Sequence, residues 1–418
     1  MSLRRLSNGT ILLGQHVDGL ELAWEPPQHK RYGYERNDEL EEQLADCQSR
    51  AMDSPALFLE TKWRYGTELE PVLVWPQGIR GARYRLECLS WLFGINSDGK
   101  PGPRGFVQLR APYLATVGAL SSFQGVRSWA DSNLLPLVGR KPDGLSTAWR
   151  VSRIDLAADV AGVSFEGGDV ARFTTRARSR RAYHEPAITD YDRRRFTGFR
   201  FGKRGGAIFA RIYRKTDEAK SDDWVREKWR LAGYDPTIHG PDVWRVEFEI
   251  RGALIRELQA NGERLPREPD ALLSAHLGTL WHYAMQKWLL LRDGQNVASR
   301  PERQAITPWW RDLGALAGFA EAPLPDAILR RVVAPSEDAV RLLNLAIGAL
   351  TSLSSLTGKT SWPDTIRLLD DFVKHSYGRR RFEEISKAKQ ARRRALRGND
   401  VLDLTKRDAV TRTRDFSK

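Results

Sequence analysis

Acidic and basic residues alternate with apolar ones in three segments of the chain, 149–163, 207–218 and 243–252. Residues two apart point to the same face of a β-strand, so each segment would have one charged and one apolar face. The charged faces would carry Arg153, Asp155, Ala157 and Asp159 in the first segment, Arg211, Tyr213 and Lys215 in the second, and Arg245, Glu247, Glu249 and Arg251 in the third.

If the three strands are neighbours, carboxylates, arginines and one tyrosine gather on one side of a sheet. Carboxylates at this density repel one another unless cations intervene, and hard divalent ions such as Mg²⁺ or Mn²⁺ take oxygen ligands of this kind. Arginines bind phosphates in a bidentate manner. A tyrosine hydroxyl, with a pKa of about 10, needs metal or cationic help to attack a phosphodiester near neutral pH. Arg211 and Lys215 are placed to supply part of that help.

A purely structural explanation exists for each strand alone. The charges of a half-exposed sheet can face solvent and form cross-strand ion pairs, and a strand tyrosine is more often a packing residue. This explanation weakens because three strands share the feature. Three functions stay open: nicking of DNA through the tyrosine, DNA binding without cleavage, and a metal-dependent nuclease that activates water and does not need Tyr213.

The surrounding pattern predicts the elements that position these strands. Further strands are indicated near residues 9–28 and at PVLVWP, ARYRLECLSWLFG and GFVQLRA, with helical segments at NDELEEQLADCQSR and 114–135. From about Ala253 onwards the pattern is helical. We expect an α+β fold, in which helices pack on one face of a mostly antiparallel sheet and a helical C-terminal region follows. The expected parts are 1–140, a core at 141–295, a helical region at 296–377 and a basic, partly disordered tail at 378–418.

The charge balance restricts the class of partner. Lys and Arg number 67 and Asp and Glu 53, a formal net charge of +14, which favours nucleic acid or an acidic membrane surface. No apolar run reaches the roughly 20 residues that span a bilayer, and the start, MSLRRLSNGT, has no apolar signal core. We therefore expect a cytoplasmic protein with no membrane partner. Cys47 and Cys88 are too few for a disulfide framework or a cysteine zinc site.

The segment from Arg172 to Arg204 is expected to be an Arg-rich loop between the first two charged strands. Its clusters RSRR and DRRRF have aromatic residues among them, a combination that suits single-stranded DNA. Its Tyr183 and Tyr191 are the rival nucleophiles to Tyr213. The RRR motifs at 379–381 and 392–394 predict sequence-independent affinity for duplex DNA. The candidate DNA-binding residues are Arg153, Arg193, Arg194, Arg195, Lys203, Arg204, Arg245 and Arg251.

The strings RIDLAAD, TGFRFGKRGGAIFARIYRKTDE and WRVEFEIRG, in this order, resemble the replication initiation factor family of rolling-circle initiators. That family includes initiators of staphylococcal plasmids, relaxases of some integrative conjugative elements and initiators of some filamentous phages. Its members typically carry an Arg-x-Asp-x-Ala-x-Asp strand, an Arg-x-Tyr-x-Lys-x-x-Glu strand and an Arg-x-Glu-x-x-x-Arg strand. This sequence has all three, and the resemblance extends from about Val151 to Leu291.

The resemblance implies an HUH-like nicking domain that cuts one strand at a replication origin and later rejoins strands. Tyr213 would be the nucleophile, forming a 5′-phosphotyrosine and leaving a free 3′-hydroxyl for a polymerase. The implied partners are single- and double-stranded DNA at the origin and a host helicase and polymerase, and a homodimer is left open. Asp155 and Glu247 match the family's acidic positions best as ligands of Mg²⁺ or Mn²⁺, Asp159, Glu218 and Glu249 are further candidates, and Arg211, Lys215, Arg245 and Arg251 would clamp phosphates or balance the carboxylates.

Two features depart from related proteins. Arg214 follows the tyrosine, where family members often have an acidic or amide residue. The better-known relaxases and viral initiators coordinate metal through a His-hydrophobic-His strand, and the seven histidines of this chain include no such pair. A metal ion would therefore be held mainly by oxygen atoms.

Overall fold

The computed structural model describes most of the chain and divides it into two compact units, Met1–Arg330 and Arg331–Lys418, which are treated separately. Side chains are not described at 184–195 and 335–344. The described residues are 4–25, 39–97, 103–138, 148–187, 190–219, 223–294, 304–316, 319, 324–330, 335–358, 361–372, 374–375, 383–384 and 387.

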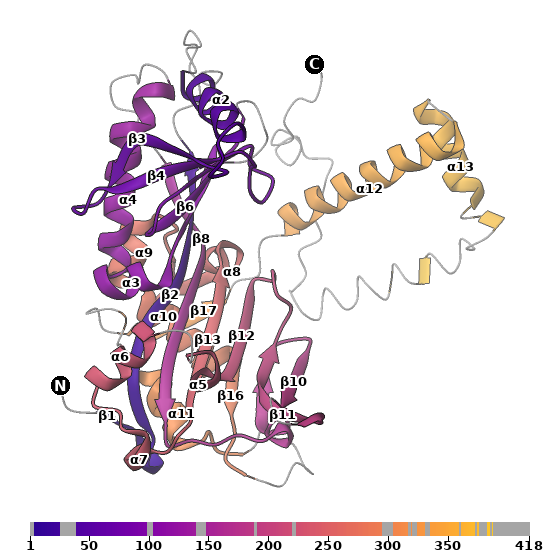
Figure 1. Ribbon diagram of the computed structural model, residues 1–418. Helices are drawn as coiled ribbons and strands as arrows, with labels where there is room; N and C mark the ends of the chain where they lie inside the picture. Colours follow the sequence, from indigo (N-terminus) through magenta and orange to yellow (C-terminus); the bar gives the residue numbers. More distant parts are fainter. Residues whose placement is uncertain are drawn as a thin grey trace. The chain divides into compact units, whose positions relative to one another are not determined.

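A large antiparallel sheet of twelve strands, counted over the described residues, runs through the first unit (Figure 1). Its strand order is β10-β11-β12-β13-β8-β2-β7-β6-β5-β4-β3, and β1 pairs with β2 beside this path. The strands are β1 (Arg4–Arg5), β2 (Ile11–Glu25), β3 (Leu59–Tyr65), β4 (Glu70–Trp75), β5 (Tyr84–Glu87), β6 (Trp91–Ile95), β7 (Gly105–Leu109), β8 (Ala148–Ala161), β10 (Arg180–Ala187), β11 (Asp190–Phe201), β12 (Ile208–Arg214) and β13 (Val243–Arg251).

Two smaller sheets accompany the large one. β14 (Leu258–Ala260) pairs with β15 (Glu263–Arg264) and β17 (Ile328–Arg330), and β16 (Leu289–Leu291) pairs with β9 (Phe173–Thr175). The boundaries expected at residues 140 and 295 both fall inside the first unit. Pairing of β2 with β8 joins the segments on either side of residue 140, and pairing of β14 with β17 joins those on either side of residue 295.

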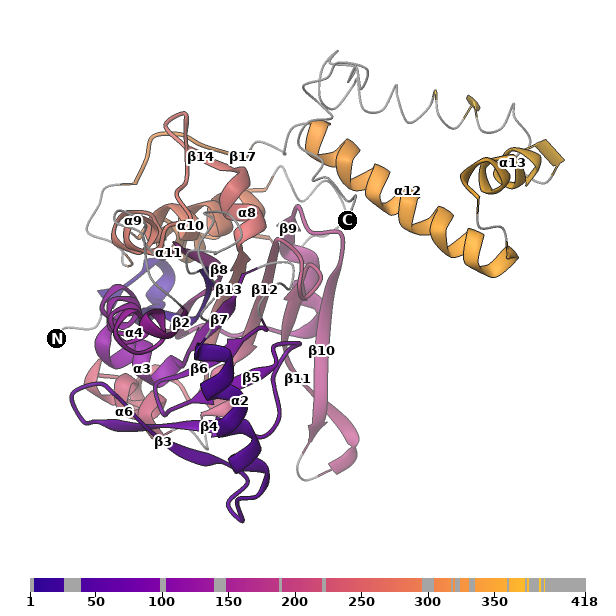
Figure 2. The ribbon, with the colours of Figure 1, turned by 90° about the horizontal axis from the view of Figure 1, so that it is seen from above.

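The helices of the first unit lie on both sides of the large sheet (Figure 2). The α-helices are α2 (Glu39–Met52), α3 (Ala111–Val117), α4 (Ala119–Asn133), α5 (Lys215–Glu218), α6 (Asp223–Leu231), α7 (Pro236–His239), α8 (Gly252–Glu257), α9 (Pro269–Ala275), α10 (Leu277–Tyr283) and α11 (Pro308–Ala315). Short 3₁₀ or π turns are η1 (Ser7–Gly9), η2 (Leu135–Val138), η3 (Gly167–Arg172) and η4 (Ala284–Trp288).

The apolar faces of the three charged strands pack on the later helices, which confirms the α+β prediction. Leu156 and Phe248 are fully buried, and the Phe248 ring lies 5.5 Å from that of Trp281 in α10 and 6.3 Å from that of Trp288 in η4, centroid to centroid. Burying one such side chain stabilises the fold by roughly 1.5–3 kcal/mol. The alternation of polar and apolar residues therefore determines that the charged face of these strands points away from the later helices.

The expectation that helices cover one face of the sheet is incomplete. Helix α6 packs on the charged face, where the Trp229 indole Nε1 donates to Asp159 Oδ2 at 2.9 Å. A second, smaller apolar cluster forms beneath it, in which Val225 and Trp229 of α6 meet Ile11 and Val243 of the sheet. This cluster forms because β2 and β13 each place apolar side chains on the charged face near their ends.

The expected loop at 172–204 is wrong for most of its length, because β9, β10 and β11 lie within it. Phe199 and Phe201 are fully buried, whereas Arg200 between them is exposed. This is the alternation of a strand with one buried face. The high density of arginines in this segment obscures the alternation in the sequence, because charged residues also predominate in exposed connections.

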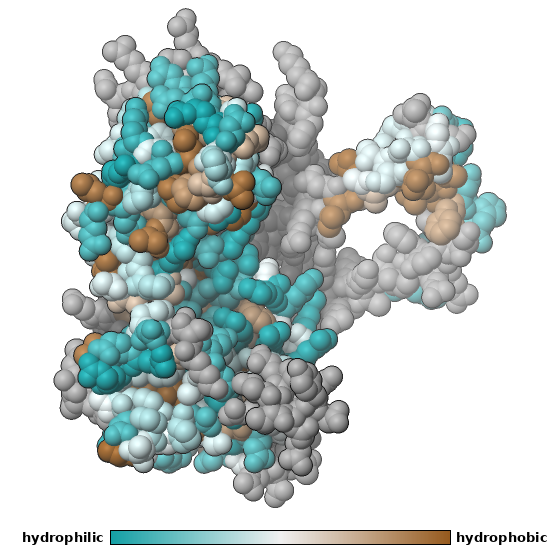
Figure 3. Space-filling model, viewed as in Figure 1, coloured by the Kyte–Doolittle hydropathy of each residue, from teal (hydrophilic) through white to brown (hydrophobic). Residues whose placement is uncertain are grey.

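The second unit contains α12 (Pro335–Thr357) and α13 (Trp362–Phe372), so the predicted C-terminal helices are present. Leu345, Leu356 and Trp362 are more than half exposed, and Figure 3 shows apolar side chains on the surface of these helices. The arginine motifs at 379–381 and 392–394 lie outside the described residues. No described helix combines the length and apolarity that a membrane span requires.

Gly198 is a position where the sheet tolerates no side chain. A Cβ atom there would lie 2.3 Å from the carbonyl oxygen of Ile212 and 2.9 Å from the Cα atom of Tyr213. We predict that Gly198→Ala lowers the free energy of unfolding by about 2 kcal/mol or more, since backbone must shift. Urea denaturation measures this change. The control is Gly168→Ala, whose Cβ meets nothing within 4 Å, and equal stability of the two variants would contradict the prediction.

Candidate active site

Pairing of β12 with β13 and of β13 with β8 brings the three charged faces together. Residues directly opposite one another in an antiparallel pair project to the same side of the sheet. The predicted site requires that the three strands are neighbours, and they are. The opposed pairs are Arg211 and Glu247, Tyr213 and Arg245, Arg245 and Asp159, Glu249 and Asp155, and Arg251 and Arg153.

Tyr213 is held by its neighbours on this face and is only 4% exposed. Its hydroxyl donates to Glu247 Oε2 at 3.1 Å, and Arg211 Nη2 donates to the other oxygen of Glu247 at 2.6 Å. The Arg211 guanidinium carbon lies 5.0 Å from the Tyr213 ring centroid. Burial and the Glu247 carboxylate raise the pKa of Tyr213 well above its usual value, although Arg245 and Arg211 oppose the shift. The hydroxyl is therefore protonated when no substrate is bound.

Lys215 and Glu218 form a separate pair on α5. The buried Lys215 Nζ lies 2.9 Å from Glu218 Oε2 and 5.9 Å from the Tyr213 ring centroid. Lys215 thus lies beside the tyrosine, but as the first residue of α5 and not on the strand where it was expected, because β12 ends at Arg214. Glu218, in contrast, is paired with Lys215 at the edge of the site and is exposed, so the structure does not bring it onto the face that carries Asp155, Glu247 and Glu249.

Three carboxylates on the sheet are buried and paired with arginines. Asp155, Glu247 and Glu249 are 5%, 3% and 4% exposed. Arg153 Nε donates to Asp155 Oδ1 at 2.8 Å, and Arg251 Nε donates to Glu249 Oε1 at 2.8 Å. A buried carboxylate is costly when it has no partner, and the partly exposed arginines compensate these three. These ion pairs therefore hold the face in the shape described.

Arg245 and Asp159 form a second cluster, set apart from the first. Arg245 is 1% exposed, and its Nε and Nη1 donate at 2.7 Å to Asp159 and to Asp18 of β2. Burial alone would raise the pKa of Asp159, but Arg245 outweighs it and lowers that pKa to about 2. Burial also lowers the pKa of His16, whose Nε2 lies 3.3 Å from Asp18. This cluster ties β13, β8, β2 and α6 together.

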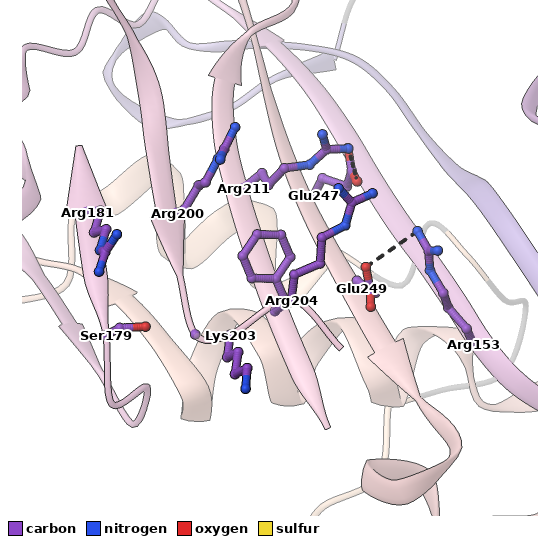
Figure 4. A pocket seen from close by; sticks show the side chains of 11 residues that line it. Arg153, Ser179, Arg181, Arg200, Lys203, Arg204, Arg211, Glu247 and Glu249 are labelled. Atoms are coloured by element: carbon purple, nitrogen blue, oxygen red, sulfur yellow. Dashed lines mark hydrogen bonds and ion pairs between the residues drawn. The ribbon is translucent and has the colours of Figure 1, made fainter. Parts of the chain in front are cut away.

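A cavity of about 450 Å³ adjoins Glu247 on the side of β11 and β10 (Figure 4). Six of its lining residues are cationic and two are acidic, and hydrophilic side chains gather on this side of the sheet (Figure 3). The predicted residues that meet here are Arg153, Lys203, Arg204, Arg211, Glu247 and Glu249. The other predicted residues whose side chains are described do not line the cavity, namely Tyr213, Lys215, Glu218, Asp155, Asp159, Arg245 and Arg251.

Several residues of the site were missed in the sequence. Asp18 and His16 belong to β2, whose pairing with β8 joins positions more than a hundred residues apart, and no motif marks them. Arg181 and Arg200 of the cavity were hidden in the supposed loop; the alternation Phe199-Arg200-Phe201 is the signal that could have found Arg200. The side chains of Arg193, Arg194, Arg195 and the rival nucleophile Tyr191 lie outside the described residues.

The carboxylates do not fit a divalent ion in their present arrangement. Among the side chains that the structure describes, no three of Asp, Glu, His or Cys form a group that could hold a metal ion. The oxygens of Glu247 accept from Arg211 and Tyr213, and those of Asp159 accept from Arg245 and Trp229. The Mg²⁺ or Mn²⁺ site stays a prediction.

Asp155 should make the stability of the protein depend on pH. Burial and the neighbouring Glu247 and Glu249 raise its pKa to about 7 despite Arg153. The folded protein then binds more protons than the unfolded chain between the usual aspartate pKa of 3.8 and this value. Its free energy of unfolding therefore decreases as the pH rises through this interval, by at most about 1.4 kcal/mol per pH unit.

We predict that Asp155→Asn removes this dependence. Urea denaturation of both proteins at pH of about 5 and about 8 should show the wild type losing stability relative to the variant at the higher pH. The exposed Asp46→Asn is the matched control. A difference between wild type and Asp155→Asn that stays constant with pH would show that Asp155 titrates outside this range.

No model of a known protein family matches the chain, and no curated protein matches it. Among solved structures, the chain is similar to a rolling circle replication initiator protein from Geobacillus stearothermophilus. The two are 14% identical with a TM-score of 0.41, and the match covers 76% of this chain and 100% of the other. A similarity of this size supports no argument about fold or function.

Proposed function

We propose that the protein is a rolling-circle replication initiator or relaxase that nicks one strand of DNA at an origin, with Tyr213 as the nucleophile. The observation that carries the proposal is the hydrogen bond of 3.1 Å from the Tyr213 hydroxyl to Glu247, a residue that also lines the cationic cavity. A nucleophile thus lies in contact with an acceptor for its proton, and that acceptor adjoins cations that can bind a phosphate. This set of groups is what attack on a phosphodiester requires.

Arg211 connects the cavity to the nucleophile. It lines the cavity, lies over the Tyr213 ring and binds Glu247. A phosphodiester entering the cavity competes for its guanidinium, since arginine binds phosphate in a bidentate manner. Glu247 then loses its strongest partner and becomes a better base. Binding of the substrate therefore activates Tyr213, which is otherwise kept protonated by burial.

The reaction that follows is a transfer of the phosphoryl group from one oxygen to another. Tyr213 Oη attacks the phosphorus as its proton passes to Glu247 Oε2, and the bond from phosphorus to the 3′-oxygen breaks. The 3′-oxygen takes a proton from water, and the hydroxide formed takes the proton held by Glu247. The products are a 3′-hydroxyl that can prime a polymerase and a 5′-phosphate on Tyr213. Lys215 and Arg245 favour the developing negative charge on the phenol oxygen. Attack of a 3′-hydroxyl on the phosphotyrosine reverses these steps and rejoins the strands.

A second candidate is DNA binding without cleavage. It is favoured by the burial of Tyr213 and by the arginine partners of Asp155, Glu247 and Glu249. In this case the carboxylates serve only to hold the sheet together. The cationic cavity would be kept and the tyrosine would be a packing residue.

The test uses single-stranded oligonucleotides that tile the DNA flanking the gene, labelled at the 3′ end, with Mg²⁺, Mn²⁺ or EDTA. A 5′-phosphotyrosine keeps the labelled fragment on the protein, so it migrates with the protein in a denaturing gel. We predict an adduct with wild type and none with Tyr213→Phe. Glu247→Gln should slow adduct formation by about 100-fold or more, since general-base catalysis contributes about 10²–10⁴.

Matched controls are Tyr113→Phe, which removes a hydroxyl bonded to Tyr65 far along the sheet, and Tyr183→Phe, which removes the rival nucleophile that the structure describes. Cleavage that survives in Tyr213→Phe without an adduct would instead support a nuclease that uses water. Binding with no cleavage of any oligonucleotide in any buffer would support the second candidate.

A further inference from the structure

Three arginines from three neighbouring strands stand in one row across the sheet. Arg181 of β10 lies opposite Arg200 of β11, and Arg200 lies opposite Arg211 of β12. All three line the cavity. Strands are about 4.8 Å apart, and like charges directly opposite each other destabilise a sheet. The row therefore opposes folding in the absence of a negatively charged partner.

The cations of this row are only partly compensated. Arg211 is paired with Glu247, and the Arg200 guanidinium lies 4.4 Å from the ring centroid of Tyr183. Among the side chains that the structure describes, no carboxylate lies within ion-pair distance of Arg181, Arg200, Lys203 or Arg204. By contrast, the arginines on β8 and β13 all have carboxylate partners in or beside the site. The uncompensated charge is thus confined to the β10–β12 side of the cavity.

The turn between β11 and β12 adds two further cations. Gly202 and Gly205 both have φ of +83°, in the left-handed region that favours glycine. Lys203 and Arg204 lie between them, exposed, and line the cavity (Figure 4). The backbone of this turn is therefore shaped to hold two cations beside the arginine row.

Phe209 is the aromatic residue among those that line the cavity. It is 7% exposed and lies two residues before Arg211, on the same face of β12 as Arg211 and Tyr213. An aromatic ring in the wall of a cationic cavity can contact a base, while the arginines around it suit the phosphates. The cavity of about 450 Å³ has the size of a site for one small organic ligand.

We propose that the row Arg181-Arg200-Arg211 holds the phosphodiester backbone of single-stranded DNA across β10, β11 and β12, and that Phe209 packs against one base of that strand. The strand approaches Tyr213 from the β10 side of the sheet, since the row ends at Arg211 beside the Tyr213 ring. The inference rests on the proposed function only in taking DNA as the ligand. It requires no cleavage and can be tested in EDTA.

The contribution of the base is measured with two fluorescent probes, an oligothymidylate of about twelve nucleotides and an abasic strand of the same length and charge. Fluorescence anisotropy at one fixed salt concentration gives both affinities. Wild type should bind the oligothymidylate about tenfold more tightly, since one stacked base contributes about 1–3 kcal/mol. Phe209→Leu should bring the two affinities within about twofold, and Phe209→Tyr, which keeps a ring, should retain the preference. Phe106→Leu is the control, because Phe106 lies near Arg80 on another part of the sheet.

The contribution of the arginine row is measured by salt dependence with the same probes. Arg200→Gln should weaken binding of both strands alike and reduce the slope of log K against log salt by about 0.7, the value for one phosphate contact in a single strand. Arg50→Gln, on the exposed face of α2, should leave the slope unchanged. Thermal melting in the absence of DNA should show Arg200→Gln no less stable than wild type, because the change relieves repulsion from Arg181 and Arg211.

Equal affinity of wild type for the two probes, or equal loss of both in folded Phe209→Leu, would overturn the role of Phe209. An unchanged salt slope in Arg200→Gln would overturn the proposal that the arginine row holds the phosphodiester backbone. If these binding results are as expected but no oligonucleotide forms an adduct, the DNA-binding role of the arginine row stands and the nicking function is rejected. Failure of this inference can thus be distinguished from failure of the proposed function.

Discussion

Arg245 is the charge around which the charged face of the sheet is built. It is 1% exposed and donates to Asp159 of β8 and to Asp18 of β2, while Asp159 also accepts from Trp229 of α6. Burying an arginine costs several kcal/mol unless its hydrogen bonds are satisfied. The three strands and α6 must therefore keep their positions for Arg245 to be tolerated. Tyr213 lies opposite Arg245 in the register of β12 and β13. The contacts that keep Arg245 buried therefore also fix the position of Tyr213.

The strands that carry the site could be predicted because their pattern is local. Alternation in β8, β12 and β13 assigns each side chain to a face without any knowledge of the neighbouring strands, and it placed Arg211, Tyr213 and Glu247 on one face correctly. The sequence does not show that the three strands are neighbours, so this had to be assumed for the site to form. Their register, which puts Glu249 opposite Asp155, depends on turns and on packing against α10, and no local pattern determines these.

Part of the cationic side of the cavity, Arg181 and Arg200, could not be predicted, for a different reason. Arg181 and Arg200 lie in a segment where arginines are so frequent that they obscure the two buried phenylalanines of β11. Asp18 of β2 belongs to no recognisable sequence motif. It reaches Arg245 only because β2, near the start of the chain, pairs with β8. Contacts between distant segments of this kind are set by the tertiary fold. The acidic half of the site and its cations Arg211, Lys203 and Arg204 could thus be predicted from the sequence, whereas the alignment of Arg181 and Arg200 with Arg211 became visible only in the folded sheet.

The two halves place opposite demands on the fold. On β8 and β13, each buried carboxylate has an arginine partner, so that side is electrostatically complete and helps to hold the sheet together. On β10 to β12, arginines face one another across the strands, so that side is complete only with an anion present. Glu247 and Arg211 lie at the boundary, joined at 2.6 Å, and Tyr213 is bonded to Glu247. A phosphate that binds at Arg211 competes with Glu247 for the same guanidinium. Under the proposed function, binding of the DNA strand would therefore also release Glu247 to act as the base for Tyr213.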